Sequence, residues 1–225
     1  MIVLDIETYK DVSDENYTKW KSATSIRKDL KDPDKIAKAQ SEATDKFALS
    51  PLTGKIILGM VLTDADGISN SAESIQIMDK NFSILKYDNP NESDLIANLL
   101  IDLETALDNG HMLVTYNGKN FDLPYIMKRS VILGIAKPHY IPYSDLISKY
   151  KNDKHVDLFQ LLNDYGQFSS LSEWSYKLHN SLELSSDGNK VGEWYETGQM
   201  AKIIDHCKDD LIKTYLLYEK LKGWL

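Results

Sequence analysis

Residues 1–7, Met1-Ile-Val-Leu-Asp-Ile-Glu7, decide how this 225-residue chain starts to fold. The apolar and β-branched residues are typical of a buried strand, and that strand ends in two acids, Asp5 and Glu7. Side chains alternate along a strand, so residues two apart point to the same side. Two carboxylates on one side of a buried strand are costly unless a cation neutralises them, which favours a metal site. The alternative is that the strand ends at Asp5 and water solvates both acids.

Apolar patterns beyond this strand predict a mixed sheet with helices on both faces. We expect further strands at 55–63, 74–78, 112–116 and 156–158, and helices at 91–109, 123–133 and 199–222. Residues 9–46 are polar, with Pro33 in the middle, and we interpret them as a surface insertion of short helices. The sequence therefore predicts a single α/β domain over residues 1–225, with a central mixed sheet of five strands and an insertion at about 9–46.

Composition excludes several classes of protein. No apolar run approaches the roughly 18–20 residues that a membrane span needs, and we expect no signal peptide at the start. A single cysteine, Cys207, excludes a disulfide framework and a thiolate zinc site, and favours a reducing, cytoplasmic compartment. The net charge of −8 argues against coating nucleic acid through bulk charge, but carboxylates gathered to hold metal can supply part of that acidity.

A third acid, Asp122, follows the polar loop Tyr116-Asn-Gly-Lys-Asn-Phe121, which comes directly after a predicted strand. Open α/β sheets place their sites in loops at the carboxyl ends of strands. The alternative is that Asp122 caps the helix that follows it, and different atoms of one carboxylate can serve both roles.

The fourth acid, Asp210, lies in the last predicted helix, four residues after His206. Residues four apart share one face of a helix, so His206 can point at the same site as Asp210. The alternative is an exposed acidic patch with a surface histidine.

Together these segments resemble the DEDD (DnaQ-like) superfamily of 3′–5′ exonucleases, which has a ribonuclease-H-like fold. Leu4-Asp-Ile-Glu-Thr8 is similar to the first exonuclease motif, Tyr116-Asn-Gly-Lys-Asn-Phe-Asp-Leu-Pro-Tyr125 to the second, and His206-Cys-Lys-Asp-Asp210 to the third. The nearest resemblance is to stand-alone exonucleases related to the proofreading domain of family B DNA polymerases. It covers residues 1–8, about 47–64, 112–130 and 154–223, and leaves out 9–46.

The resemblance implies a metal-dependent 3′–5′ exonuclease that acts on 3′ ends of nucleic acid, releases nucleoside 5′-monophosphates and serves DNA repair or replication. It implies two Mg²⁺ or Mn²⁺ ions held by Asp5, Glu7, Asp122 and Asp210. Hard cations of this kind prefer oxygen ligands. The water-activating position holds His206 at the spacing that the superfamily gives to a tyrosine. Imidazole can act as a general base, or here be too short to reach the water. A register that used Asp209 would match neither known pattern.

We expect substrate contacts next to these acids, from Thr8, Tyr116, Asn117 and Phe121. Asn117 can hydrogen-bond the terminal nucleotide, and Phe121 or Tyr116 can stack on a base, although Phe121 can equally anchor the core. Lys119 and Lys208 are candidates for phosphate contacts. DNA is favoured over RNA through the resemblance alone. The alternatives are an RNA exonuclease, or a catalytically weak nucleic-acid-binding or partner-binding module on the same fold.

Overall fold

The computed structural model describes residues 1–24, 31–64, 73–137, 143–149, 151–163, 166, 168–179 and 187–225. These residues form a six-stranded sheet in the order β3-β4-β2-β1-β5-β6. The strands are β1 (Ile2–Lys10), β2 (Gly54–Thr63), β3 (Glu73–Ile77), β4 (Lys80–Tyr87), β5 (Leu113–Thr115) and β6 (His155–Asp157). Because β1 pairs antiparallel with β2 and parallel with β5, the sheet is mixed, and the predicted α/β fold is confirmed.

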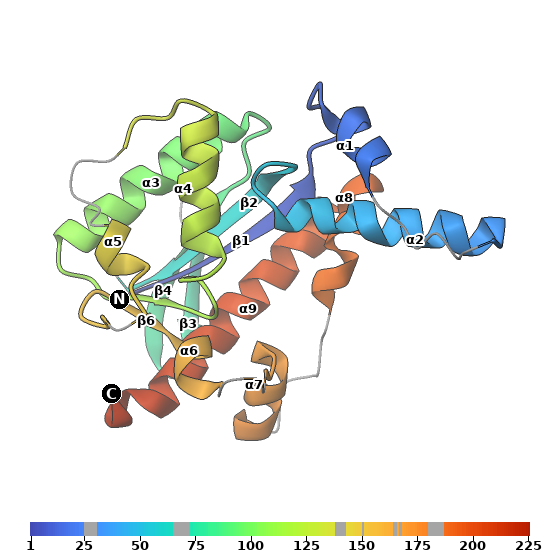
Figure 1. Cartoon of the computed structure of the whole chain (residues 1–225). Helices are drawn as coiled ribbons and strands as arrows, with labels where there is room; N and C mark the ends of the chain where they lie inside the picture. The colour runs from blue at the N-terminus through green and yellow to red at the C-terminus, as the bar shows by residue number, and fades with distance from the viewer. Residues whose placement is uncertain are drawn as a thin grey trace.

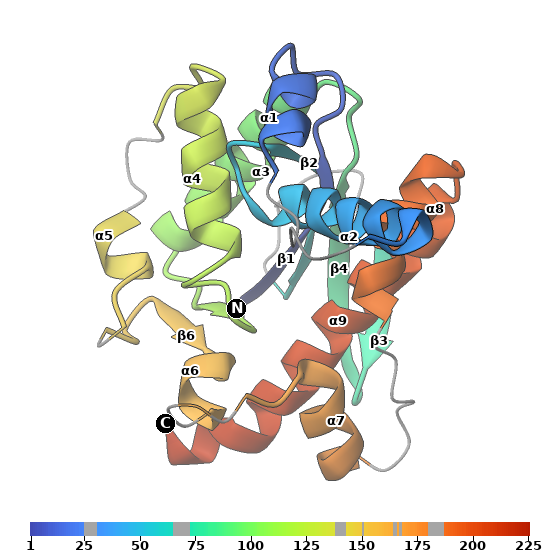
Figure 2. The same cartoon turned by 45° about the vertical axis from the view of Figure 1, so that its right-hand side comes forward.

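Helices cover both faces of this sheet (Figures 1 and 2). They are α1 (Tyr17–Ala23), α2 (Pro33–Asp45), α3 (Glu92–Asp108), α4 (Asp122–Ile132), α5 (Tyr143–Leu146), α6 (Leu158–Leu162), α7 (Leu171–His179), α8 (Val191–Glu196) and α9 (Met200–Leu221), with 3₁₀ turns η1 (Lys46–Leu49), η2 (Asp187–Lys190) and η3 (Lys222–Trp224). Helices α3, α4 and α5 pack into one core cluster, and α6 to α9 pack into another.

The central strand β1 divides its side chains between the two cores. Ile2, Leu4 and Ile6 lie in the core with α3 and α4, whereas Val3 and Tyr9 lie in the core with α9. This alternation is what a strand buried on both faces requires. Odd-numbered side chains of β1 therefore point toward α9, and the predicted acids are two of them.

The sixth strand, β4, is absent from the sequence prediction of five strands. It pairs with β3 through a hairpin whose turn is Met78-Asp79, and both turn residues have positive φ, 48° and 62°. Such turns are usually marked by Asn-Gly or Asp-Gly, which supply positive φ at little cost. Met-Asp carries no such signal, so the second strand of the hairpin was missed.

The segment 9–46 begins as a continuation of β1 rather than as an insertion, because β1 extends to Lys10. It then forms α1 and α2, of which α2 lies beside α8 (Figures 1 and 2), while residues 25–30 fall outside the described residues. Asp32 caps α2 by accepting hydrogen bonds from the backbone N–H groups of Asp34 and Lys35. Among the described residues, no helix combines the length and the apolar character needed to cross a membrane.

Candidate active site

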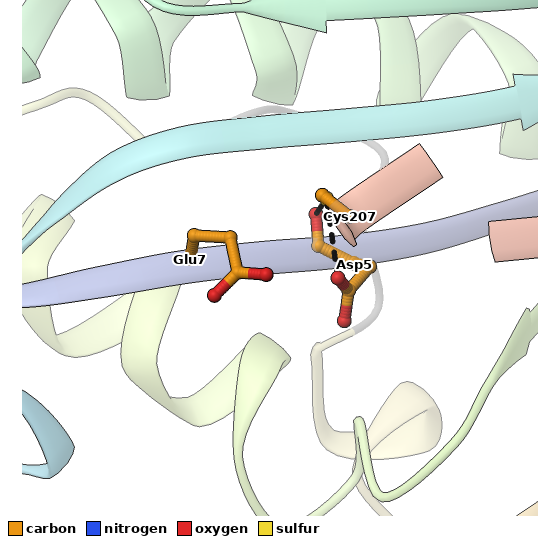
Figure 3. Close-up of side chains that lie close together, drawn as sticks. All are labelled: Asp5, Glu7 and Cys207. Carbon is orange, nitrogen blue, oxygen red and sulfur yellow. Dashed lines mark hydrogen bonds between the residues drawn. The ribbon is translucent and has the colours of Figure 1, made fainter. Parts of the chain in front are cut away.

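Asp5 and Glu7 lie on β1 and face α9. The Cys207 thiol of α9 donates a hydrogen bond to Asp5 Oδ2 at 3.1 Å (Figure 3). His206 Nε2 lies 3.6 Å from Glu7 Oε1. One side-chain oxygen from each acid and the Cys207 sulfur lie within 4.8 Å of one another. The side chain of Glu7 is only 12% exposed, so the alternative that water fully solvates both acids is wrong.

Asp122 reaches β1 from the loop after β5. The pairing between β1 and β5 covers Ile2 and Val3 only, which leaves the Ile6 N–H free of that strand. Asp122 Oδ1 accepts a hydrogen bond from this N–H at 3.1 Å. Asp122 is the first residue of α4 and makes no side-chain capping bond, because the cap position is held by Phe121. Its carboxylate thus sits beside the residue that separates Asp5 from Glu7.

Helix α9 supplies the fourth acid and the histidine. Asp210 Oδ2 lies 3.8 Å from His206 Nε2, and the His206 side chain is 11% exposed, so His206 is not a solvated surface histidine. Asp209 forms an ion pair with Lys213, whose Nζ also lies 3.8 Å from Asp210 Oδ1. Asp210, and not Asp209, raises the pKa of both Asp5 and Glu7.

Burial and neighbouring carboxylates raise the pKa values of both acids on β1. Burial raises the pKa of Asp5 well above its usual value, and the nearby carboxylates of Asp122, Glu7 and Asp210 raise it further. Burial also raises the pKa of Glu7, with Asp210 and then Asp122 adding to the rise. Like charges brought together away from water disfavour the ionised form. The four acids that lie far apart in the sequence are therefore one electrostatic cluster.

The other two acids are partly stabilised as anions. Burial raises the pKa of Asp122 to about 7, although backbone N–H groups, including that of Ile6, stabilise its charged form. Burial raises the pKa of Asp210 as well, against the opposing effect of His206 and Lys213. A divalent cation would relieve the repulsion that remains, and buried carboxylate oxygens are the donors that Mg²⁺ and Mn²⁺ prefer. The residues present therefore fit such ions.

A fifth acid, Asp157, fixes the loop between β5 and α4. Its carboxylate accepts hydrogen bonds from the backbone N–H groups of Asn117 at 2.8 Å, Lys119 at 2.9 Å and Phe159 at 3.0 Å. Asn117 has a φ of 71°, and an added Cβ on Gly118 would overlap Thr115. The loop is thus held in a tight shape that sets the position of Asp122.

The predicted substrate contacts divide into two places. Thr8 and Phe121 line a pocket of 540 Å³ that also contains Glu7. Phe121 packs on Tyr125, with ring centroids 5.4 Å apart, so it both lines the pocket and borders the core. Tyr116 instead directs its hydroxyl to the carbonyl of Ser169.

The two lysines predicted as candidates for phosphate contacts have partners within the protein. Lys119 is 3% exposed, and its Nζ donates to Lys151 O at 2.8 Å and to Asn152 Oδ1 at 2.9 Å. Lys208 forms an ion pair with Glu73, whose side chain is 62% exposed. Burial therefore argues against a phosphate contact for Lys119, whereas the contact of Lys208 stays a prediction.

Cys207 and Gly188 are site residues that sequence reasoning missed. Cys207 lies three residues before Asp210, so helical spacing already placed both on one face, but a lone cysteine reads as a core residue. A Cβ added to Gly188 would lie 3.6 Å from His206 Nε2, so η2 passes close to the histidine. No pattern in the sequence signals that approach.

Comparison with solved structures identifies the class of fold. A family B DNA polymerase from the archaeon Pyrobaculum calidifontis matches with a TM-score of 0.59 at 16% identity, over 98% of this chain and 24% of that chain. The mixed sheet and its flanking helices are therefore similar in fold to a part of that polymerase. The chain belongs to the family described as predicted 3′–5′ exonucleases related to the exonuclease domain of PolB, whose model matches residues 67–224.

Curated relatives are similar to shorter parts of the chain. DNA polymerase 1 of Aeropyrum pernix is 34% identical over 64 residues, which is 28% of this chain. A DNA polymerase of Thermococcus aggregans is 28% identical over 123 residues, or 47% of this chain. The matched region spans 7% of each of these polymerases. The family match begins after β1 and β2, so it does not include Asp5 and Glu7.

Proposed function

We propose that the protein is a metal-dependent 3′–5′ exonuclease that hydrolyses phosphodiester bonds at the 3′ ends of DNA and releases nucleoside 5′-monophosphates. One observation carries the proposal: acids from β1, α4 and α9 converge, and Asp122 of α4 and Asp210 of α9 each raise the pKa of both Asp5 and Glu7 on β1. Without cations such a cluster repels both itself and phosphate. Divalent ions bound between the acids would offset this repulsion.

Asp5, Glu7, Asp122 and Asp210 would hold two Mg²⁺ or Mn²⁺ ions. When bound, a pair of such ions supplies an activated water and stabilises the leaving oxygen of an in-line displacement. The protein's own contribution is to fix the carboxylates: the Ile6 N–H orients Asp122, and the Cys207 thiol orients Asp5.

His206 is placed to orient and deprotonate the attacking water. Its Nε2 lies 3.6 Å from Glu7 and 3.8 Å from Asp210, beyond hydrogen-bond distance of both, so its ring nitrogen is not consumed by either carboxylate. Trp194 borders the ring edge-on with centroids 6.2 Å apart. A histidine held between two acids beside the pocket suits a general base.

The terminal nucleotide would bind in the pocket beside Glu7, with Thr8 and Phe121 in its wall. Asn117, in the loop that Asp157 fixes, would hydrogen-bond the terminal nucleotide, and Tyr116 of the same loop would stack on a base. DNA is preferred because the similar proteins are DNA polymerases. A reducing, cytoplasmic setting suits the free, buried Cys207.

A gel assay tests the proposal directly. Single-stranded DNA and RNA of matched sequence, each labelled at the 5′ end, are incubated with the protein and Mg²⁺, Mn²⁺ or a chelator. We expect a ladder that shortens from the 3′ end of DNA, with loss of the ladder under chelation. If RNA is degraded faster than DNA, the preferred substrate is RNA and the proposed preference for DNA is wrong. A protein that binds both strands but shortens neither with either ion would be a binding module, and the proposed activity would be wrong.

A further inference from the structure

The segment from α2 to η1 forms one side of the pocket that contains Glu7. Pocket residues from this segment are Glu42, Asp45, Lys46, Ala48 and Leu49. The family match begins at residue 67, so this wall lies outside it. The segment therefore forms part of the pocket beside Glu7, a proposed metal ligand.

This wall is fastened to the strands and helices around the site. Lys10 of β1 forms ion pairs with Asp45 at 3.1 Å and with Glu196 of α8 at 2.9 Å. Tyr125 of α4 donates a hydrogen bond from its hydroxyl to Ala48 O at 2.9 Å. These contacts join α2 and η1 to β1, α4 and α8. A wall held from three sides keeps a defined distance from Glu7.

Two side chains of the wall carry chemistry that suits a nucleotide. Leu49 is 64% exposed although it is apolar, and it lines the same pocket as Phe121. Lys46 is exposed and has no ion-pair partner among the residues that the structure describes. Lys10, by contrast, is neutralised by two carboxylates. The pocket thus offers apolar surface and a lysine in the same wall as Glu42 and Asp45.

We propose that Lys46 and Leu49 bind the 3′-terminal part of the substrate, with Leu49 against the terminal base and Lys46 against a phosphate. The inference rests on the proposed function, because it assigns residues to the substrate of the same site. A polyanion needs a cation beside an acidic cluster, and base faces pack well on apolar side chains. The segment 9–46 then contributes to substrate affinity.

The first test compares Lys46→Glu with Lys38→Glu. Both changes reverse one charge on the same segment, but Lys38 is 78% exposed, lies outside the pocket and forms only an exposed ion pair with Glu42 at 3.9 Å. Binding of a 5′-fluorescein-labelled single-stranded DNA is measured by anisotropy with Ca²⁺, which takes oxygen ligands, over a range of salt concentrations. We expect Lys46→Glu to reduce the slope of log affinity against log salt by about 0.7, the value for one phosphate contact on a single strand. Equal slopes for both variants would overturn the assignment of Lys46.

The second test compares Leu49→Ala with Leu52→Ala. The two leucines are 64% and 67% exposed, but Leu52 lies in a different pocket, beside α4. Product inhibition by a nucleoside 5′-monophosphate measures binding of the terminal unit. We expect Leu49→Ala to weaken inhibition by about 3- to 10-fold, as the loss of a few buried methyl groups predicts, and Leu52→Ala to leave it unchanged. Equal inhibition of the two variants would overturn the assignment of Leu49.

These tests separate the inference from the proposed function. If Lys46→Glu lowers the salt slope relative to Lys38→Glu but wild-type protein never shortens DNA with Mg²⁺ or Mn²⁺, the assignment of Lys46 stands and the exonuclease proposal is wrong; anisotropy titration of a fluorescent nucleoside 5′-monophosphate then replaces product inhibition as the test of Leu49. If wild-type protein degrades DNA while Lys46→Glu matches Lys38→Glu in salt slope, the exonuclease proposal stands and the wall assignment is wrong. Circular dichroism spectra of all four variants check that the helices are retained.

Discussion

The substitution Asp122→Asn should make the metal-free protein more stable while removing its response to metal. Burial raises the pKa of Asp122 from 3.8 to about 7. One pKa unit corresponds to about 1.4 kcal/mol, so ionising this group in the folded state at pH 7.5 costs up to about 4 kcal/mol. Asparagine keeps an oxygen that can accept the Ile6 N–H and carries no charge. Because neighbouring acids can take up part of the proton, we expect a gain of about 2–4 kcal/mol.

The sign of the pH dependence follows from the direction of the shift. A group whose folded pKa is raised contributes its full stability below the unfolded value, here 3.8, and loses it as the pH rises through about 7. The advantage of Asp122→Asn over wild type should therefore be below about 1 kcal/mol at pH 4 and largest above pH 7. Urea denaturation at pH 4, 6 and 7.5, with a chelator present, measures the difference.

Asp205→Asn is the matched control, since it removes the same charge from an exposed position on α9. Its effect on the free energy of unfolding should stay within about 0.5 kcal/mol. Addition of Mg²⁺ should raise the melting temperature of wild type and of Asp205→Asn, but not of Asp122→Asn, because a ligand that binds only the folded state stabilises it. A destabilised Asp122→Asn variant, or a gain that is the same at every pH, would refute the reasoning.

Further substitutions test the remaining parts of the site. Asp5→Ala and Asp210→Ala should each abolish Mg²⁺-dependent degradation of labelled DNA without lowering the melting temperature, and a variant that keeps wild-type activity would remove that acid from the ligand set. His206→Phe should slow cleavage by about 10²- to 10⁴-fold and alter the pH–rate profile, as loss of a general base does; an unchanged profile would remove His206 from catalysis. Arg129→Ala should cost about 3 kcal/mol in urea denaturation, because the nearly buried carboxylate of Glu92, bonded to Arg129 Nε at 2.9 Å, loses its cation and keeps only the hydrogen bond from the Ile56 N–H; a cost below about 1 kcal/mol would contradict this.

The long helices could be predicted from the sequence because local signals agree with the fold. The predicted helix at 91–109 is α3 (Glu92–Asp108), where Asn91 caps the first turn by accepting the Ser93 N–H at 3.0 Å. The prediction at 199–222 is α9 (Met200–Leu221). In both, an apolar stripe at helical spacing faces the sheet. Periodicity and capping are local properties, so no knowledge of distant contacts was needed.

Features set by contacts between distant residues could not be read in the same way. Cys207 meets Asp5 across 202 residues of sequence, and the identity of the two side chains says nothing of that meeting. Lys119 looks like an exposed loop lysine, yet its Nζ is consumed by the backbone and side chain of residues 151 and 152. The four acids could be predicted because the segments around them resemble known exonuclease motifs. Which neighbours orient them depends on how α9 crosses β1.

The position of α9 explains why the same carboxylates destabilise the metal-free fold and yet stay within reach of a metal ion. Ile203 and Leu211 of this helix are fully buried, whereas Asp210 keeps 26% of its side chain exposed. The site therefore lies at the boundary between the buried apolar face of α9 and its solvent-exposed face. Burial raises the pKa of Asp210, and Glu7 is the one acid of the four that lines the 540 Å³ pocket. If this boundary position sets the pKa values of the acids, removing any one of them should raise the free energy of unfolding of the metal-free protein and lower its affinity for metal ions. The gain in stability and the loss of metal affinity should then rank the four acids in the same order.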